Sequence, residues 1–206
     1  MSDGGGAATN TGIDYQQRLA AYFLVQMLLD LDSLSGIGLD GVYPITDVSF
    51  ESSSCIDDIV IRTKSGDLYI QAKRNISMSD NADSEFQKTI NQFVNQFLLN
   101  STANDKYVLA TSSGTSPKIR HDLRKILESV RLNDTDFKNN PLNQSEEEVY
   151  TKLKNCLSTA YKGATNKAIT DSILTSLLKQ IHVVIADVQQ GMPLEGAILT
   201  VLATST

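Results

Sequence analysis

Apolar residues recur along the chain with two different periods, and these periods predict where helices and strands alternate. Residues 1–11 are rich in Gly, Ala, Thr and Asn, and we expect them to form a flexible tail. A helical pattern begins near Gly12, and from Leu19 to Leu31 it is apolar on nearly every side. Such a helix is buried on more than one face. Three glycines between residues 36 and 41 are expected to end it.

Alternation of apolar and polar residues predicts three short strands after this helix, over residues 46–51, 57–63 and 67–74. The sequence Lys64-Ser65-Gly66-Asp67 separates the last two strands and has the chemistry of a hairpin turn. We expect Lys64 to pair with Asp67 across this turn.

Helices dominate the rest of the pattern. The expected elements are an amphipathic helix over 84–99, a buried strand over 106–111, helices over 116–131, 145–159 and 165–180, a strand over 181–188 and a helical pattern over 194–203. This succession predicts an α/β fold with a mixed sheet. We expect one domain over residues 12–206, with its core at about 12–131 and a helical extension with the last strand at 145–206.

Composition and charge narrow the functional classes. The 206 residues suffice for one sizeable domain, and the formal net charge of -6 argues against a general DNA-packaging protein, which would be basic. Cys55 and Cys156 cannot form a disulfide framework, and neither has a neighbouring Cys or His for a zinc site. No signal peptide and no apolar run of roughly 20 residues is evident, so we expect a cytoplasmic protein that does not span a membrane.

Polar side chains gather at the ends of the two hairpin strands. Gln71 and Lys73 share one face of their strand, because side chains alternate along it. With Lys64 opposite Asp67, Asp58 is expected directly opposite Lys73 and diagonal to Gln71. A one-residue bulge at Gly66 would bring Asp57 there instead.

An acid, an amide and an ammonium group together suit a magnesium site, since Mg²⁺ prefers oxygen ligands and keeps several waters. Asp58, Gln71 and the Ala72 backbone carbonyl are the expected ligands, and Lys73 would orient or deprotonate a metal-bound water. The residue types also leave open an ordinary ion pair between Asp58 and Lys73, with Gln71 incidental.

The segment from Gly12 to Arg74 resembles the core of the PD-(D/E)xK nucleases, in the Mrr-like branch that has QxK in place of (D/E)xK. The matching pieces, in order, are GIDYQ at the start of the buried helix, IDDIVI over 56–61 and YIQAKR over 69–74. This resemblance implies a restriction-endonuclease-like fold, with a mixed central sheet flanked by helices, and an additional helical portion after about residue 133. It also implies Mg²⁺-dependent hydrolysis of DNA phosphodiesters, with Mn²⁺ as a substitute.

The same order of motifs resembles the endonuclease domains fused to SAVED sensor domains in bacterial CBASS systems and to STAND NTPases in Avs-type anti-phage systems. That resemblance implies double-stranded DNA as substrate, a sensor or NTPase domain in the same full-length chain and a homo-oligomer in the active state. The apolar helical pattern near the end of the sequence agrees with a chain that continues. The alternative is a catalytically degenerate nuclease fold that binds DNA or oligomerises.

The sequence departs from the family where many relatives carry acids. Gln16 stands at the position of a helix-one Glu, and Gln71 replaces the middle acid of the motif, so Glu51 is a candidate to compensate. Basic residues beside an apolar stripe make the helix over 116–131 a candidate border of a DNA groove. The candidate DNA contacts are Arg74, Lys118, Arg120, Arg124 and Lys125. His121 and His182 have no catalytic partner in the pattern.

Overall fold

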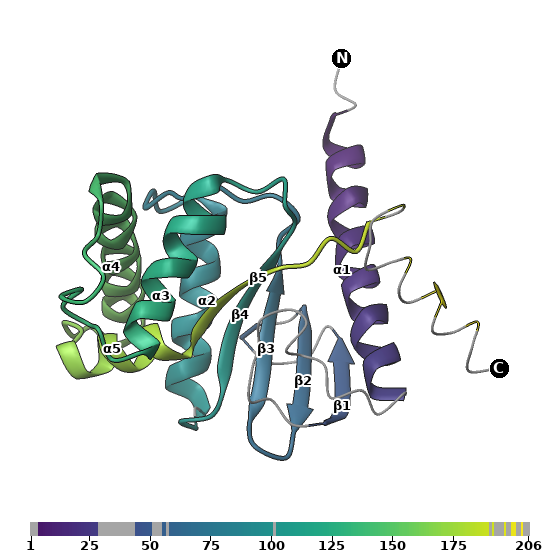
Figure 1. The fold of residues 1–206 in the computed structure, drawn as a ribbon, viewed down its shortest axis with the longest axis horizontal. Coiled ribbons are helices and arrows are strands. Elements are labelled where there is room, and N and C mark those ends of the chain that lie inside the picture. The colour runs from purple at the N-terminus through teal and green to yellow at the C-terminus, as the bar shows by residue number, and fades with distance from the viewer. Residues whose placement is uncertain are drawn as a thin grey trace.

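A five-stranded sheet in the order β1-β2-β3-β4-β5 forms the middle of the protein (Figure 1). The computed structural model describes residues 4–28, 44–50, 55–56, 58–100 and 102–189, together with 191, 196, 199–200 and 203. The strands are β1 (Ile45–Phe50), β2 (Ile59–Thr63), β3 (Asp67–Ala72), β4 (Lys106–Thr111) and β5 (Ile181–Ile185). β1, β2 and β3 are antiparallel neighbours, whereas β3, β4 and β5 run parallel.

Two crossover connections join the parallel strands and supply most of the helices. The first is α2 (Glu85–Asn100), and the second contains η2 (Lys118–Leu123, a π-helix), α3 (Arg124–Arg131), α4 (Gln144–Thr165) and α5 (Asp171–Gln180). Both crossovers step across the sheet in the same direction, and crossovers of one hand then place their helices on one face. The remaining helix, α1 (Gly4–Leu28), covers the other face (Figure 1).

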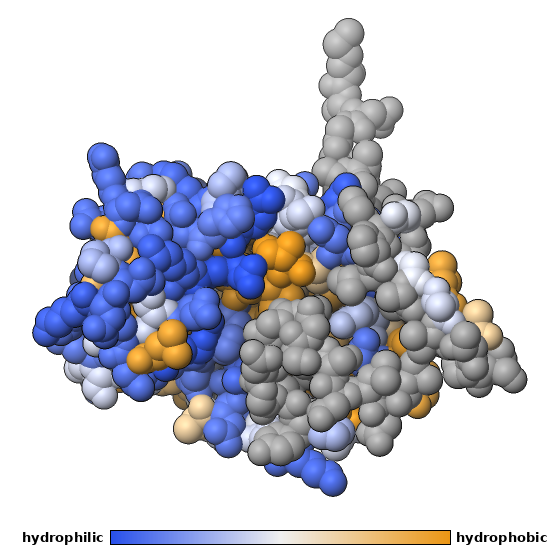
Figure 2. All heavy atoms as spheres, viewed as in Figure 1, coloured by the Kyte–Doolittle hydropathy of each residue, from blue (hydrophilic) through white to orange (hydrophobic). Residues whose placement is uncertain are grey.

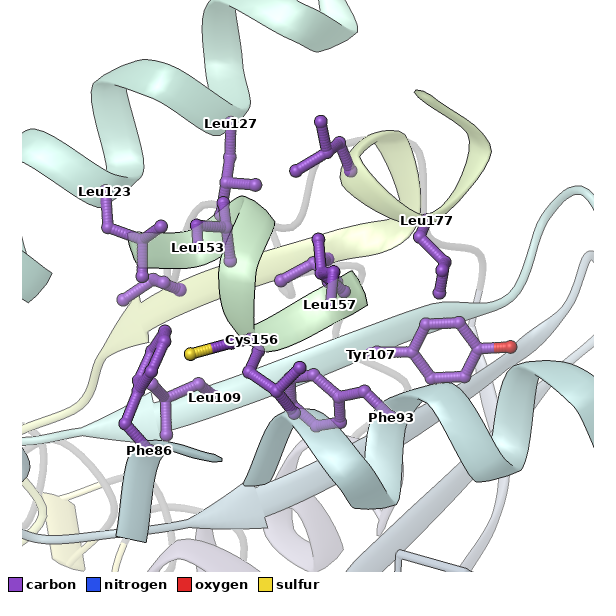
Figure 3. Close-up of a cluster of buried hydrophobic side chains, with 14 of the residues drawn as sticks. Phe86, Phe93, Tyr107, Leu109, Leu123, Leu127, Leu153, Cys156, Leu157 and Leu177 are labelled. Atoms are coloured by element: carbon purple, nitrogen blue, oxygen red, sulfur yellow. The ribbon is translucent and has the colours of Figure 1, made fainter. Parts of the chain in front are cut away.

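The larger hydrophobic core lies between the sheet and the crossover helices (Figure 3). Tyr107 of β4 and Cys156 of α4 lie within it, and burial raises the pKa of the Cys156 thiol to about 12. Around them pack side chains from every crossover helix, including Phe86, Phe93, Leu123, Leu127, Leu153, Leu157 and Leu177. Truncating one such leucine to alanine typically costs about 2–5 kcal/mol.

The second core fixes α1 against the opposite face of the sheet. Tyr15, Leu19 and Phe23 of α1 pack on apolar residues of β2, β3 and β4. The Tyr15 hydroxyl donates a hydrogen bond of 3.1 Å to the carbonyl of Ala186, just after β5. The middle of α1 is therefore tied to the end of the sheet where β4 and β5 finish.

The sequence pattern predicted this architecture closely in most elements, and the α/β class with a mixed sheet is confirmed. Two differences stand out. α1 begins at Gly4, inside the segment expected as a tail. The helices after residue 133 share the core of α2 and α3, and β5 adds the fifth strand, so this part is integral to the domain. The expected glycine break at 36–41, and most of the helical pattern over 194–203, lie outside the described residues.

The surface is hydrophilic over α3, α4 and α5 in the view of Figure 2, with a hydrophobic patch nearer the middle of that face. No helix within the described part of the chain is long and apolar enough to cross a membrane.

Candidate active site at the ends of strands β2 and β3

The hairpin register differs from the sequence expectation by two residues. Arg62, and not Lys64, pairs with Asp67. Thr63 closes the turn, with its amide and its hydroxyl both donating to the carbonyl of Gly66, at 3.3 and 2.7 Å. A Cβ atom on Gly66 would lie 2.8 Å from the backbone of Asn104. The turn is therefore held against a distant loop, and this contact has no local signal in the sequence.

The new register places Asp58 opposite Gln71, one step beyond the Ile59–Ile70 pair, with Lys73 on the diagonal. The expectation of Asp58 directly opposite Lys73 was wrong. A shift of two residues leaves every side chain on its face, because the period of a strand is two. Gln71 and Asp58 therefore still share a face, on the side of α2.

The Asp58 carboxylate is held by β3. Its Oδ2 accepts hydrogen bonds from the Gln71 side-chain amide and, at 2.7 Å, from the Ala72 backbone amide. The Gln16 side chain of α1 donates to the Asp58 backbone carbonyl at 3.4 Å, so the glutamine in helix one also reaches this strand end. The arrangement fixes the carboxylate at the point where β3 finishes.

Gln71 is buried, and of its two side-chain polar atoms only the amide nitrogen has a hydrogen-bond partner in the described structure. Its side chain is 2% exposed, and its Oε1 is buried with no hydrogen-bond partner in the described structure. A buried acceptor left without a donor costs about 1–3 kcal/mol. A buried amide oxygen that lacks a hydrogen-bond donor and lies next to a carboxylate is a suitable ligand for a hard cation.

Lys73 follows directly after β3, and its ammonium turns to α2. Its Nζ lies 3.3 Å from Oε2 of Glu85, which also pairs with Lys88 at 3.0 Å. The pKa of Glu85 is lowered, chiefly by the hydrogen bond from Lys88, with Lys73 adding to the effect and partial burial opposing it. Sequence reasoning missed Glu85, whose only signal is an acid in the first turn of a helix.

A hollow of about 300 Å³ opens beside Glu85, between the loop after β3 and the loop after β4. Small polar residues dominate its lining, among them Asn75, Ser79, Ser84, Gly114 and Ser116. Gly114 lies so close to Asn75 that a Cβ atom there would be 2.9 Å from the Asn75 Oδ1. The hollow therefore provides polar space next to the Lys73–Glu85 pair.

The oxygen donors of this strand end fit a hard cation in part. Asp58 and Gln71 supply a carboxylate and an unpaired amide oxygen. No group of three His, Cys, Asp or Glu side chains that could hold a metal occurs among the described residues. Asp57 and Glu51, the other candidate ligands, lie outside them. Such a donor set suits an ion that keeps most of its waters, as Mg²⁺ does.

The basic helix is partly neutralised by α4. Lys118 pairs with Glu148 at 2.6 Å, and Lys125 pairs with the buried carboxylate of Glu146 at 2.8 Å. Lys118 and Lys152 together hold the pKa of Glu148 at about 2. These lysines therefore bind η2 and α3 to α4.

The arginines among the candidate DNA contacts differ in exposure. Arg124 and Arg74 are exposed, whereas Arg120 is half-buried and its Nε has no partner within the described chain. The structure thus leaves Arg124 and Arg74 as the accessible cations of this set.

Comparison of the chain with protein-family models, with curated proteins and with solved structures finds no match.

Proposed function

We propose that this chain is a metal-dependent endonuclease domain that hydrolyses phosphodiester bonds of double-stranded DNA. The observation that carries the proposal is the meeting of the Asp58 carboxylate with the buried, half-satisfied amide of Gln71, with Lys73 next on the same strand. The order of helix, Asp58 strand, turn and Gln71-Ala72-Lys73 strand, within a mixed sheet flanked by helices, supports the restriction-endonuclease-like fold.

Asp58 and Gln71 would hold Mg²⁺ through the Asp58 carboxylate and the Gln71 Oε1. When bound, the metal lowers the pKa of a coordinated water and polarises a phosphoryl oxygen. Ala72 contributes by fixing the Asp58 carboxylate through its amide, so that the carboxylate cannot rotate away. This preorganisation matters because a ligand set with one carboxylate binds metal weakly until substrate phosphate adds its own oxygens.

Lys73 supplies the positive charge at this site. Its pairing with Glu85 is an exposed ion pair, with side-chain exposures of 32% and 55%, and such pairs contribute about 0–1 kcal/mol. A DNA phosphate can therefore replace Glu85 at little cost. Lys73 would then donate to a phosphoryl oxygen and orient the attacking water, while the polar hollow beside Glu85 receives the neighbouring nucleotide.

Cleavage of both strands requires two such sites. We propose that the domain acts as the effector of a longer anti-phage defence protein, whose sensor or NTPase domain clusters several copies. Clustering raises the local concentration of weak sites, and this raises cleavage without any new contact at the metal.

The test is incubation of supercoiled plasmid with the protein in Mg²⁺ and in EDTA, with two matched variants. Lys73 and Lys88 both pair with Glu85, but only Lys73 belongs to the strand of the site. We expect Mg²⁺-dependent cleavage that Lys73→Ala abolishes and Lys88→Ala retains. Equal cleavage by both variants would show that the activity does not use this site.

A degenerate fold remains the second candidate, because the described residues offer no three-acid metal cluster. In that case the chain binds DNA but leaves plasmid intact in Mg²⁺ and in Mn²⁺, and Lys73→Ala has no cleavage to remove.

A further inference from the structure

A cluster of basic groups lies where β4 and β5 begin, and two of its members are on the face of the sheet opposite Asp58 and Gln71. Val108 of β4 is in register with His182 of β5, and both belong to the face that α1 covers. Lys106 opens β4 two residues before Val108, so its side chain shares that face. Lys106 and His182 are therefore diagonal neighbours on adjacent strands.

Arg131 reaches the same place from the other side of the sheet. It ends α3, and its Nη1 donates a hydrogen bond of 2.9 Å to the carbonyl of Ile181, directly before His182. β5 is the last strand of the described sheet, and the guanidinium contacts its backbone at Ile181. Three residues from three distant parts of the sequence thus lie near the start of β5.

His182 is buried within this cluster without a partner. Its side chain is 7% exposed, and its Nε2 has no hydrogen-bond partner in the described structure. Burial, and then the charges of Arg131 and Lys106, lower its pKa to about 3. A neutral imidazole with a proton on Nε2 would be a buried donor that no protein acceptor satisfies.

Among the described residues, neither of the two cations has a close counter-charge. Burial lowers the pKa of Lys106, and the nearby Arg131 lowers it further. Within the described chain, no carboxylate lies within ion-pair distance of either residue. Burial lowers the pKa of Arg131; Glu128, one turn earlier in α3, raises it, and Arg124 lowers it. Two half-buried positive charges therefore stand together without direct compensation, which is unfavourable unless an anion joins them.

We infer that Lys106, Arg131 and His182 form a binding site for a phosphoryl group or a similarly compact oxyanion, separate from the Asp58–Gln71 site. Arginine presents planar paired donors that match such an oxygen pair, and lysine adds a point charge. The His182 Nε2 supplies a directed donor from the sheet. One such oxyanion would accept a hydrogen bond from the buried His182 Nε2 and would offset the positive charges of Lys106 and Arg131.

Two sources could supply that ligand chemistry: a small phosphorylated molecule or the backbone of a nucleic acid. Lys106 and His182 lie on the sheet face opposite Asp58 and Gln71, near the starts of β4 and β5, so a ligand here does not compete for the Asp58 oxygens. A phosphorylated small molecule would act as an effector, whereas a nucleic-acid backbone would extend the DNA surface around the edge of β5.

The chain contains two histidines, which provides an internal control for a direct experiment. Imidazole nitrogen resonances of the ¹⁵N-histidine-labelled protein are followed at neutral pH while inorganic phosphate replaces chloride at constant ionic strength. We expect the His182 signals to shift saturably and those of the exposed His121 to stay unchanged. Unchanged His182 signals with both inorganic phosphate and a short DNA duplex would overturn the inference.

A matched pair of lysine variants tests whether the effect is local. Loss of one charge-assisted bond from Lys106→Met should weaken phosphate binding about tenfold, whereas Lys167→Met, at an exposed lysine outside the cluster, should leave it unchanged. Equal affinity in both variants would contradict the site. A duplex that shifts His182 at far lower concentration than phosphate identifies the nucleic-acid backbone as the source; phosphate alone identifies a small molecule.

Discussion

The Gln71 side chain donates its amide to the Asp58 carboxylate across the β2–β3 pair, and its own oxygen is buried without a hydrogen-bond partner among the described residues. The Ala72 amide holds the same carboxylate oxygen at 2.7 Å. The contact orients two oxygen ligands at a strand end at the expense of one unsatisfied acceptor. Such a local loss of stability is typical of sites kept for chemistry.

Gln71→Glu should convert this site into a stronger metal site with a less stable metal-free form. Two neighbouring carboxylates repel each other, and the cost without metal should be on the order of 2 kcal/mol. Mg²⁺ relieves that repulsion, so it should raise the Tm of the variant more than that of the wild type. Gln87→Glu is the control, since Gln87 is equally buried, at 2% exposure, but its amide donates to Asn91 and to the Cys156 carbonyl and not to Asp58. An equal Mg²⁺ effect on both variants would argue against a metal at Gln71.

Glu85→Gln should tighten DNA binding by up to about fivefold, since it removes the acid that competes with phosphate for Lys73. The stability of the protein should change by less than about 0.5 kcal/mol, as is usual for exposed ion pairs. Fluorescence anisotropy with a labelled duplex measures the affinity. Weaker binding would mean that Glu85 orients Lys73 toward DNA, contrary to the competition described above.

Arg124→Glu should weaken DNA binding and reduce the slope of log K against log salt by about one, as expected when one phosphate contact is lost. Lys118→Ala should have a much smaller effect, because Lys118 is already paired with Glu148. Binding isotherms at several salt concentrations separate the two cases. Identical slopes for Arg124→Glu and the wild type would show that Arg124 does not contact a DNA phosphate.

His182 should make the protein less stable as the pH falls. Its folded-state pKa is lowered from the usual 6.5 to about 3. Between these pH values the imidazole therefore binds a proton in the unfolded chain but not in the folded protein. The stability that depends on a neutral His182 is fully present above about pH 6.5 and is lost progressively as the pH falls toward 3.

Urea denaturation in chloride-based buffers without oxyanions measures this dependence. His182→Phe should flatten the profile between pH 6.5 and 4 relative to the wild type. A profile of unchanged steepness in the variant would assign the acid sensitivity to other groups.

The shared face of Asp58, Gln71 and Lys73 could be predicted from strand alternation, because the period of two survives a register shift of two residues. The register itself could not be predicted. It depends on Thr63 closing the turn and on the approach of Gly66 to Asn104, which lies in a distant loop.

Contacts between distant segments were beyond the sequence pattern for the same reason. Glu85 meets Lys73 only because the loop after β3 returns α2 to the strand end. The second crossover brings Arg131 and His182 to the start of β5, next to the start of β4 where Lys106 lies. The pairing of Lys118 and Lys125 with α4 likewise could not be read from their clustering on one helix.

The most direct test of the central claim is plasmid cleavage by the domain fused to an inducible oligomerisation module, with Asp58→Asn as the matched variant. Asparagine retains the shape of Asp58 and can still accept the Ala72 hydrogen bond, but it removes the charged metal ligand. The account predicts Mg²⁺-dependent linear product from the clustered wild type, less from the monomer and none from Asp58→Asn or in EDTA. Intact plasmid with the clustered wild type, or equal cleavage by Asp58→Asn, would contradict it.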